Sequence, residues 1–223
     1  MFRKTIYTVT FLLTAVTLSA HATFVDPNFS GASEYEGWSD MTRTRLPGYP
    51  DPTMGGSSTD LWPMPIAPND PGSAGNAEFD KISGGGYPAG SSIYNSFTPG
   101  NFTITNDNPL ANLATVLFQI ETGASIVSAP VLNYNGGTQA MTADITFNGT
   151  GPIDNTYGFQ WDLSGVVDVI TSFDIDWGTS AFAANYAMQL DSADSFSPVP
   201  VPAAFWLLVS ACGGLFGATR RRS

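Results

Sequence analysis

Asp174 and Asp176 are the two side chains whose type and spacing best suit chemistry in this chain. They alternate with apolar neighbours in the run Phe173–Trp177, a period typical of a β-strand. Residues two apart on a strand share a face, about 6.5–7 Å apart, and Ca²⁺ binds carboxylate oxygens. The pair therefore indicates a Ca²⁺ site, with Asp162 and Asp168 on or near neighbouring segments. The sequence favours the alternative, a solvated outer sheet face in a very acidic protein.

Glycoside hydrolysis is the other reaction that carboxylates could perform here. It requires two of them across a cleft, about 5–5.5 Å or 6.5–9.5 Å apart. No spacing selects a pair, and two of the candidates fall in an irregular segment that positions side chains poorly. We therefore expect a protein that is not an enzyme and has no cofactor, with a carbohydrate-active enzyme as the alternative. The candidate glutamates are Glu34, Glu36, Glu78 and Glu121.

Most other reactive groups are missing from the central part of the chain. The single histidine is His21 and the single cysteine is Cys212, each near one end. Residues 23–197 therefore have no disulfide, thiol catalysis, Ser-His-Asp triad or zinc site built from His or Cys. The 19 acidic residues all lie in this part with only three basic ones, a net charge of −16 at pH 7. Such a surface repels nucleic acid, so no nucleic-acid partner is expected.

The elements that must position these residues are short strands separated by turn residues. Period-two patterning and turn signals such as Asn135-Gly136 indicate an all-β domain, an antiparallel β-sandwich or jelly roll, over residues 23–197. The expected strands are Glu78–Ile82, Ser92–Tyr94, Asn101–Thr105, Ala114–Glu121, Ser125–Asn133, Met141–Phe147, Tyr157–Leu163, Ile170–Trp177 and Tyr186–Leu190.

The stretch from residue 26 to residue 76 is different, because seven prolines fall between Pro47 and Pro71. Proline interrupts both helices and central strands. We expect an extended surface segment with one or two short edge strands, held to the core by apolar anchors. The expected anchors are Trp38, Tyr49, Leu61, Trp62 and Ile66. The alternative for the three aromatic anchors is a sugar-binding platform.

The N-terminal end has the pattern of a secretory signal peptide. Arg3 and Lys4 precede a short apolar stretch, and Ala20-His21-Ala22 forms an A-x-A cleavage site. The prediction is that residues 1–22 are removed after Ala22. Residues 23–197 would then be exported.

The C-terminal end, residues 198–223, has three parts in order. A hinge, Val199-Pro200-Val201-Pro202-Ala203, leads into the uncharged run from Ala203 to Ala218, and Arg220, Arg221 and Arg222 follow. The run of 16 residues predicts a short membrane-spanning helix. Arginines after a spanning helix favour keeping that end in the cytoplasm.

This tail resembles the PEP-CTERM class of bacterial sorting signals, in the variant that reads Val-Pro-x-Pro-Ala. The resemblance covers about 25 of the 223 residues. It implies an inner-membrane precursor in a Gram-negative bacterium, recognised by an exosortase-type transpeptidase. The tail would be removed and the domain released to the cell surface or into an exopolysaccharide matrix. We therefore expect a structural or adhesive biofilm protein in contact with exopolysaccharide, and keep an uncut membrane-anchored surface domain as an alternative.

Overall fold

The computed structural model describes residues 24–49, 59–123, 125–137, 140–150 and 155–199. The predicted signal peptide (residues 1–22) and the tail from residue 200 onward lie outside these residues. Among the residues that are described, no helix has the length and apolar character needed to cross a membrane.

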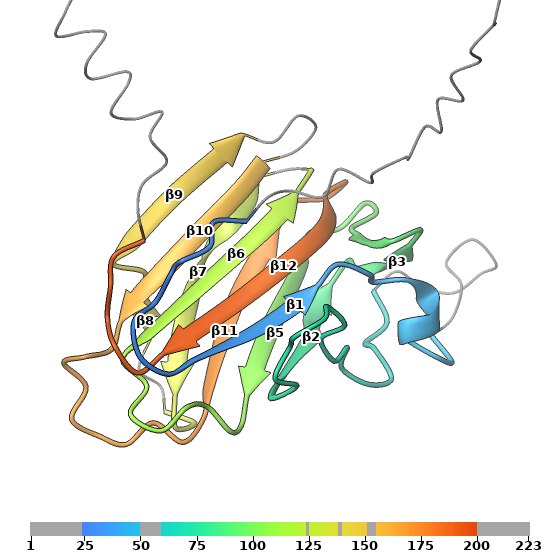
Figure 1. Ribbon diagram of the computed structural model, residues 1–223. Helices are drawn as coiled ribbons and strands as arrows, with labels where there is room; N and C mark the ends of the chain where they lie inside the picture. The colour runs from blue at the N-terminus through green and yellow to red at the C-terminus, as the bar shows by residue number, and fades with distance from the viewer. Residues whose placement is uncertain (1–23, 50–58, 124, 138–139, 151–154, 200–223) are drawn as a thin grey trace, which may run out of the picture.

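Two antiparallel β-sheets pack face to face (Figure 1). The seven-stranded sheet has the order β3 (Tyr87–Ala89), β4 (Ser92–Tyr94), β12 (Ala184–Ala193), β6 (Thr115–Thr122), β10 (Asn155–Asp162) and β9 (Ile145–Thr150), with β1 (Ser33–Trp38) also paired to β12. The five-stranded sheet has the order β2 (Ala77–Gly84), β5 (Gly100–Asn106), β11 (Phe173–Thr179), β7 (Ile126–Tyr134) and β8 (Met141–Thr142). One short 3₁₀ helix, η1, spans Arg43–Arg45. The prediction of an all-β sandwich is confirmed.

The core between the sheets is rich in aromatic rings. In β11 the apolar members of the alternating run, Phe173, Ile175 and Trp177, are buried and their polar neighbours are not. The Trp177 ring lies 4.8 Å from the ring of Phe118 on the opposite sheet and 5.7 Å from that of Phe79 on its own sheet. These centroid distances fall within the favourable range for aromatic pairs. The alternation of apolar and polar residues along β11 thus directs Trp177 toward the opposite sheet, where it contacts Phe118.

Most expected strands form close to their expected limits, but Met141–Phe147 is divided between the sheets. β8 belongs to one sheet and β9 to the other, and the chain turns between them at Asp144. The Asp144 backbone N–H donates to the Gln160 carbonyl at 2.8 Å, and its side chain accepts from the Asp162 backbone N–H at 2.7 Å. The correction is that these residues form a corner between two strands, held by bonds to β10.

Two further strands and one boundary also differ from expectation. β1 is the edge strand anticipated within residues 26–76, although its position was not predicted, and β3 was missed because Pro88 lies within it. β11 begins at Phe173 and not at Ile170. The Asn135 side-chain oxygen accepts a hydrogen bond from the Thr171 backbone N–H at 2.7 Å. The residues directly before β11 are therefore bonded to the end of β7 and not to a neighbouring strand.

The proline-rich segment is held to the core by its aromatic residues, as the anchoring interpretation predicts. Trp38, Tyr49 and Trp62 are buried, as is Ile66. The indole N–H of Trp38 donates to the Ile66 carbonyl at 2.9 Å, and that of Trp62 to the Gly86 carbonyl at 3.0 Å. Buried ring faces cannot serve as a sugar platform, so that alternative is wrong. Leu61 was wrongly predicted as an anchor, because it is 63% exposed.

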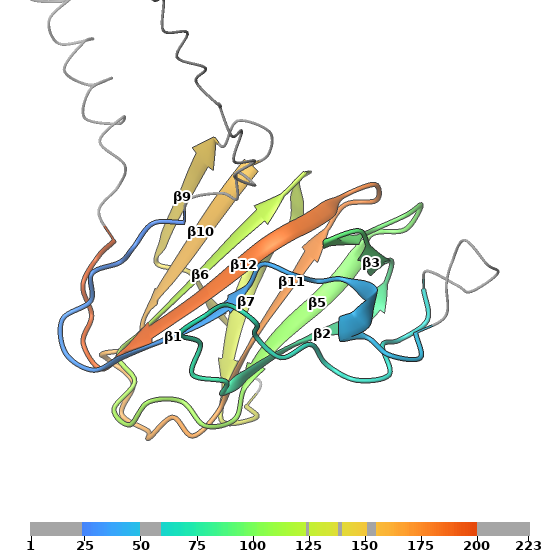
Figure 2. The ribbon, with the colours of Figure 1, turned by 45° about the vertical axis from the view of Figure 1, so that its right-hand side comes forward.

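The outer face of the seven-stranded sheet is covered by the two ends of the described chain. Figure 1 shows the blue N-terminal segment crossing this sheet, and Figure 2 shows it beside the orange-red C-terminal segment. The Gln119 side chain of β6 bonds both backbone groups of Val25, at 2.9 Å each. The Gln160 side chain of β10 donates to the Ser197 carbonyl at 2.8 Å and accepts from the Val199 N–H at 3.0 Å.

Candidate functional site

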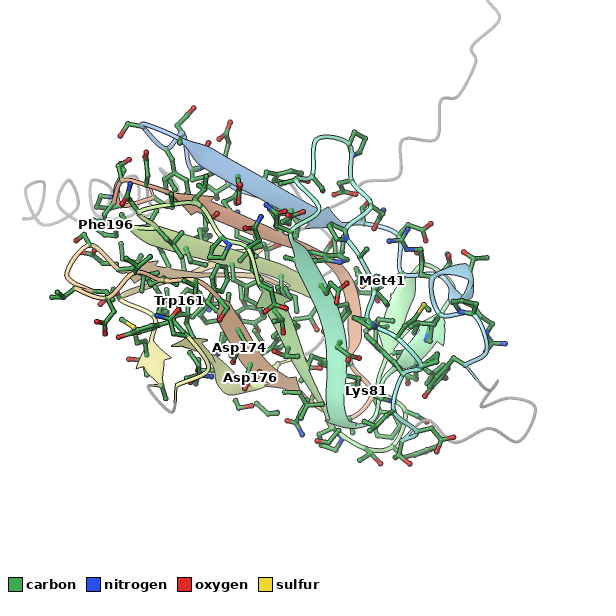
Figure 3. All side chains as sticks on the ribbon, turned by 90° about the horizontal axis from the view of Figure 1, so that it is seen from below. Met41, Lys81, Trp161, Asp174, Asp176 and Phe196 are labelled. Atoms are coloured by element: carbon green, nitrogen blue, oxygen red, sulfur yellow. The ribbon has the colours of Figure 1, made fainter. Side chains whose placement is uncertain are left out.

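Asp174 and Asp176 lie next to each other on the outward side of β11 (Figure 3). The side-chain amide of Asn133 donates to Asp174 at 2.8 Å. Burial raises the pKa of Asp176, a hydrogen bond from Thr103 lowers it, and the charge of Asp174 raises it further. The shared face was therefore predicted correctly, and both side chains already have polar neighbours of the sheet itself.

The strand register extends this pair into two polar rows across the sheet. Asp174 is aligned with Thr105 and Asn133, and Asp176 with Thr103 and Val131. β2 adds its own carboxylates, since Glu78 pairs with Thr105 and Asp80 with Thr103. Each row thus alternates a carboxylate with a threonine along the outer face of the sheet.

The described residues do not extend this pair into a larger group of possible metal ligands. Within residues 24–199, leaving out the undescribed positions, no three His, Cys, Asp or Glu side chains are grouped to hold a metal ion. Asp162 lies at the end of β10 in the other sheet, and Asp168 lies in the link before β11. Asp162 is therefore not on a strand paired with β11, whereas Asp168 lies in the link that leads into β11, and a Ca²⁺ role for Asp174 and Asp176 stays a prediction.

A hollow of about 360 Å³ lies next to the pair on the same face. Asp176, Asn101 and Ile82 are among the residues lining it. Its shape depends on Gly178, because a Cβ there would lie 2.6 Å from the Ser128 hydroxyl oxygen and 2.9 Å from the Asn101 side-chain oxygen. Any larger residue at this position would clash with these two side chains unless they moved.

A larger hollow, about 640 Å³, opens between the N-terminal segment, β1 and β12. Three of its lining residues, Asp26, Glu34 and Asp191, carry carboxylates. Asp191 is only 6% exposed, and burial raises its pKa to about 7. A hydrogen bond from Gln189, at 2.8 Å, lowers the pKa, while the charge of Asp26 raises it further. The hollow therefore holds a carboxyl group that can exchange a proton near neutral pH.

Aromatic rings form part of the wall of this larger hollow. Phe24, Phe29 and Tyr35 line it. The Tyr35 hydroxyl donates to Asp70 at 3.1 Å, and burial, followed by the charge of Asp70, raises the pKa of Tyr35. One carboxylate oxygen of Glu34 is buried with no hydrogen-bond partner among the described residues.

The four glutamates proposed for glycoside hydrolysis lie on three strands of the two sheets. Glu34 lines the larger hollow, whereas Glu36 is buried and accepts the backbone N–H groups of Gly75 and Asn76 at 2.9 and 2.7 Å. Glu78 lies on the outer face of the five-stranded sheet, and Glu121 is buried in β6 of the other. Glu34 and Glu36 lie two apart on β1, but Glu34 is the one of the four that lines the larger hollow.

Asp191 was not singled out from the sequence. The only available signal was the alternation of Gln189 and Asp191 with Met188 and Leu190, which places the polar pair on the outward face of β12. That pattern predicts an exposed aspartate. Its neighbours in the fold include Tyr35 of β1 and Asp26, which are far away in the chain, and no local pattern indicates such distant contacts.

Of the predicted sorting motif, only Val199 is described. It is 4% exposed and packs in a small apolar cluster with Leu117 and Phe147, to which Val25 adds an apolar contact. The remaining motif positions, Pro200 to Ala203, lie outside the described residues, as do Arg220 to Arg222. The predicted cleavage residues Ala20 and Ala22 do too.

Comparisons with known proteins provide no relative, since no family model, curated protein or solved structure matches this chain. The function is therefore argued from its own residues.

Proposed function

We propose that the chain is an exported, non-enzymatic protein of the cell surface or extracellular matrix. An exosortase-type enzyme sorts it from an inner-membrane precursor, and the released domain is structural or adhesive in contact with exopolysaccharide. We further propose that the fold is of jelly-roll type, which is supported by the repeated passage of the chain from one sheet to the other between β4 and β12. No cofactor is required for this work.

One observation carries this proposal: the three-part C-terminal end. A proline hinge, 16 uncharged residues and three arginines occur in the order that membrane arrest and recognition require. The fold supports it, since Val199 is bonded to Gln160 directly before Pro200. The described sandwich thus extends to Val199, so cleavage after this residue retains the side chain and the hydrogen bond that Val199 contributes.

The mass of the mature protein, isolated from the cells that produce it, tests the proposal. We expect loss of residues 1–22 and of the residues beyond about 200, with the protein in the surface or matrix fraction. Substitution of Arg220, Arg221 and Arg222 by glutamine should impair sorting, whereas Arg43→Gln, which changes a charge on the exposed surface of the sandwich, should not. A protein of full C-terminal length that stays in the membrane would favour the uncut surface domain. A cytoplasmic protein with residues 1–22 retained would refute export.

A second candidate function is favoured by Asp191. A carboxyl group with a pKa of about 7, lying in a hollow with Asp26 and Glu34, has the property required of a general acid in glycoside cleavage. Turnover of an exopolysaccharide by the purified protein, abolished by Asp191→Asn and unchanged by Asp168→Asn, would establish that function. Absence of turnover would leave Asp191 as a buried group of the fold.

A further inference from the structure

Two phenylalanines at one end of the sandwich are exposed and in contact with each other. Phe97 is 83% exposed and Phe182 is 59% exposed. Their ring centroids are 5.3 Å apart and their planes are nearly perpendicular, at 84°. Single exposed apolar side chains are common on protein surfaces and need no explanation. A pair of aromatic rings that contact each other and remain exposed to solvent does need an explanation, because burying both rings would be favourable.

The two links that carry these rings are tied together by a buried side chain. Phe97 lies in the link between β4 and β5, and Phe182 lies in the link between β11 and β12. Figure 2 shows these two links at the upper right end of the sandwich. Asn95 is fully buried, and its amide donates to the Thr179 carbonyl and hydroxyl and to the Ser180 carbonyl, at 3.2, 2.8 and 3.0 Å. The Phe182 N–H donates to the Ser96 carbonyl at 2.9 Å. The rings therefore project from a fixed base.

The backbone at Phe182 is in the left-handed region, with φ of 61°. An L-residue with a bulky side chain rarely adopts this conformation, whereas glycine adopts it freely. Strain of this kind is concentrated at sites of function. Since the Phe182 ring stays 59% exposed, it adds little burial that would offset the strain. The stability of the fold therefore does not explain why position 182 is a phenylalanine.

The surroundings of the pair restrict what it can bind. Residues 96–99 and 180–183 contain no charged side chain, and hydroxyls occur at Ser96, Thr98 and Ser180. A stable protein interface buries about 800 Å² on each partner, and two phenylalanines supply roughly 150–250 Å² each when buried completely. The two rings alone do not supply that area, and a chain with 19 acidic residues repels anionic surfaces. A sugar ring fits: its C–H face stacks on an aromatic ring and its hydroxyls bond with hydroxyl side chains.

We propose that Phe97 and Phe182 form a stacking platform for uncharged sugar units of a polysaccharide. This inference deepens the proposed function and rests on it, because it identifies where the domain contacts its matrix. The perpendicular rings present two faces in different directions, so the platform holds a sugar chain by its ring faces. Binding is weak at one unit and increases with chain length, because successive units can occupy the platform.

The test is sedimentation of the full chain, in mild detergent, with insoluble cellulose, mannan and curdlan. Phe97→Ala and Phe182→Gly should each weaken binding at least about tenfold, the loss expected from removing one buried ring. Phe97→Trp should retain binding. Val167→Ala serves as the matched control, because Val167 is 97% exposed and lies in the link before β11. Phe182→Gly also removes the strain, so its melting temperature should equal or exceed that of the parent chain.

Several outcomes would overturn the inference. The first is absence of binding to all three polysaccharides. The second is that Phe97→Ala and Phe182→Gly bind as strongly as the parent chain. The third is that Val167→Ala loses as much binding as these two variants. Self-association or binding to neutral phosphatidylcholine vesicles that is lost in Phe97→Ala would assign the pair to another partner. The proposed function fails separately. If the chain is cytoplasmic yet binds through the pair, only the localisation is wrong, and if it is in the matrix but the variants bind normally, only the platform is wrong.

Discussion

Asp191 makes the stability of this protein depend on pH near neutrality. Burial raises its pKa from 3.8 to about 7, so the folded protein holds a proton that the unfolded chain releases between these values. The free energy of unfolding should therefore fall as pH rises from about 4 to 7, by up to about 4 kcal/mol from this group. Above about pH 7 Asp191 is ionised in the folded protein as well, and the full decrease in the free energy of unfolding is present.

The Asp191→Asn variant should remove this dependence, because asparagine resembles the protonated carboxyl and can still accept from Gln189. We expect the variant to be more stable than the parent at pH 8 and nearly equal to it at pH 4.5, as measured by urea denaturation. Asp168→Asn, in an exposed link, is the control. Parallel pH profiles for parent and Asp191→Asn would show that Asp191 is not responsible.

Lys81 is a buried cation enclosed by aromatic rings. Its ammonium donates to the Tyr49 hydroxyl at 3.2 Å and to the Gly86 carbonyl at 3.0 Å, and lies 5.2 Å from the Tyr49 ring centroid and 6.0 Å from that of Trp62. Burial lowers its pKa to about 8. The folded protein therefore binds fewer protons than the unfolded chain between about pH 8 and 10.5, and this contribution to stability rises with pH across that window.

Two substitutions at Lys81 separate its charge from its bulk. Lys81→Ala should lower the free energy of unfolding by about 2–4 kcal/mol, because a cavity remains beneath the proline-rich segment. Lys81→Met should cost less than about 1 kcal/mol at pH 7, since it fills the space without a desolvated charge and the Gly86 carbonyl still accepts from Trp62. Thermal unfolding measures both. Equal losses would show that the ammonium itself is required.

Strands β6 and β10 hold the two ends of the domain through one glutamine each. Gln119→Leu should release the segment around Val25, and Gln160→Leu the segment around Val199, each costing about 1–3 kcal/mol through unpaired backbone groups. Hydrogen exchange provides the measurement. Each variant should lose amide protection at its own end and keep it at the other, so the two serve as mutual controls. Loss at both ends in either variant would mean that the segments depend on each other.

The strands themselves followed from local pattern, and their partners did not. Alternation in Phe173–Trp177 and in the run around Phe102 identified inward and outward residues correctly, because successive side chains of a strand point to opposite faces. Pairing is carried by backbone hydrogen bonds, which are the same for every residue type. The sequence therefore contained no signal that β12 lies beside β6, or that residues 141–147 divide between two sheets.

For the molecule as a whole, the position of tail cleavage decides whether the fold stays intact. Val199 packs its buried side chain against Leu117 of β6 and Phe147 of β9, and its N–H donates to Gln160 of β10. A chain ending at Val199 should match the stability of the longer chain, whereas one ending at Asp194 should lose about 2–4 kcal/mol. Denaturant unfolding of the two truncated chains distinguishes them. Equal stability would show that residues 195–199 contribute nothing to the fold.

The candidate sites show the same division between local and distant information. The outward placement of Asp174 and Asp176 was predictable, because it needs only the period of one strand. The burial of Asp191 and the contact between Phe97 and Phe182 were not, since each depends on segments far apart in the chain. Phe182 also lies in a short run of small residues that carries no periodic signal.

Composition and patterning alone determined that this chain is acidic, lacks central histidine and cysteine, and forms strands with defined inner faces. Those properties are sums over residues or repeats along a few neighbours, so they are present before the chain folds. The tertiary structure alone decided which strands became neighbours, which polar groups lost their water, and which rings were left exposed. Each of these depends on the free energy of contacts between segments that only folding brings together.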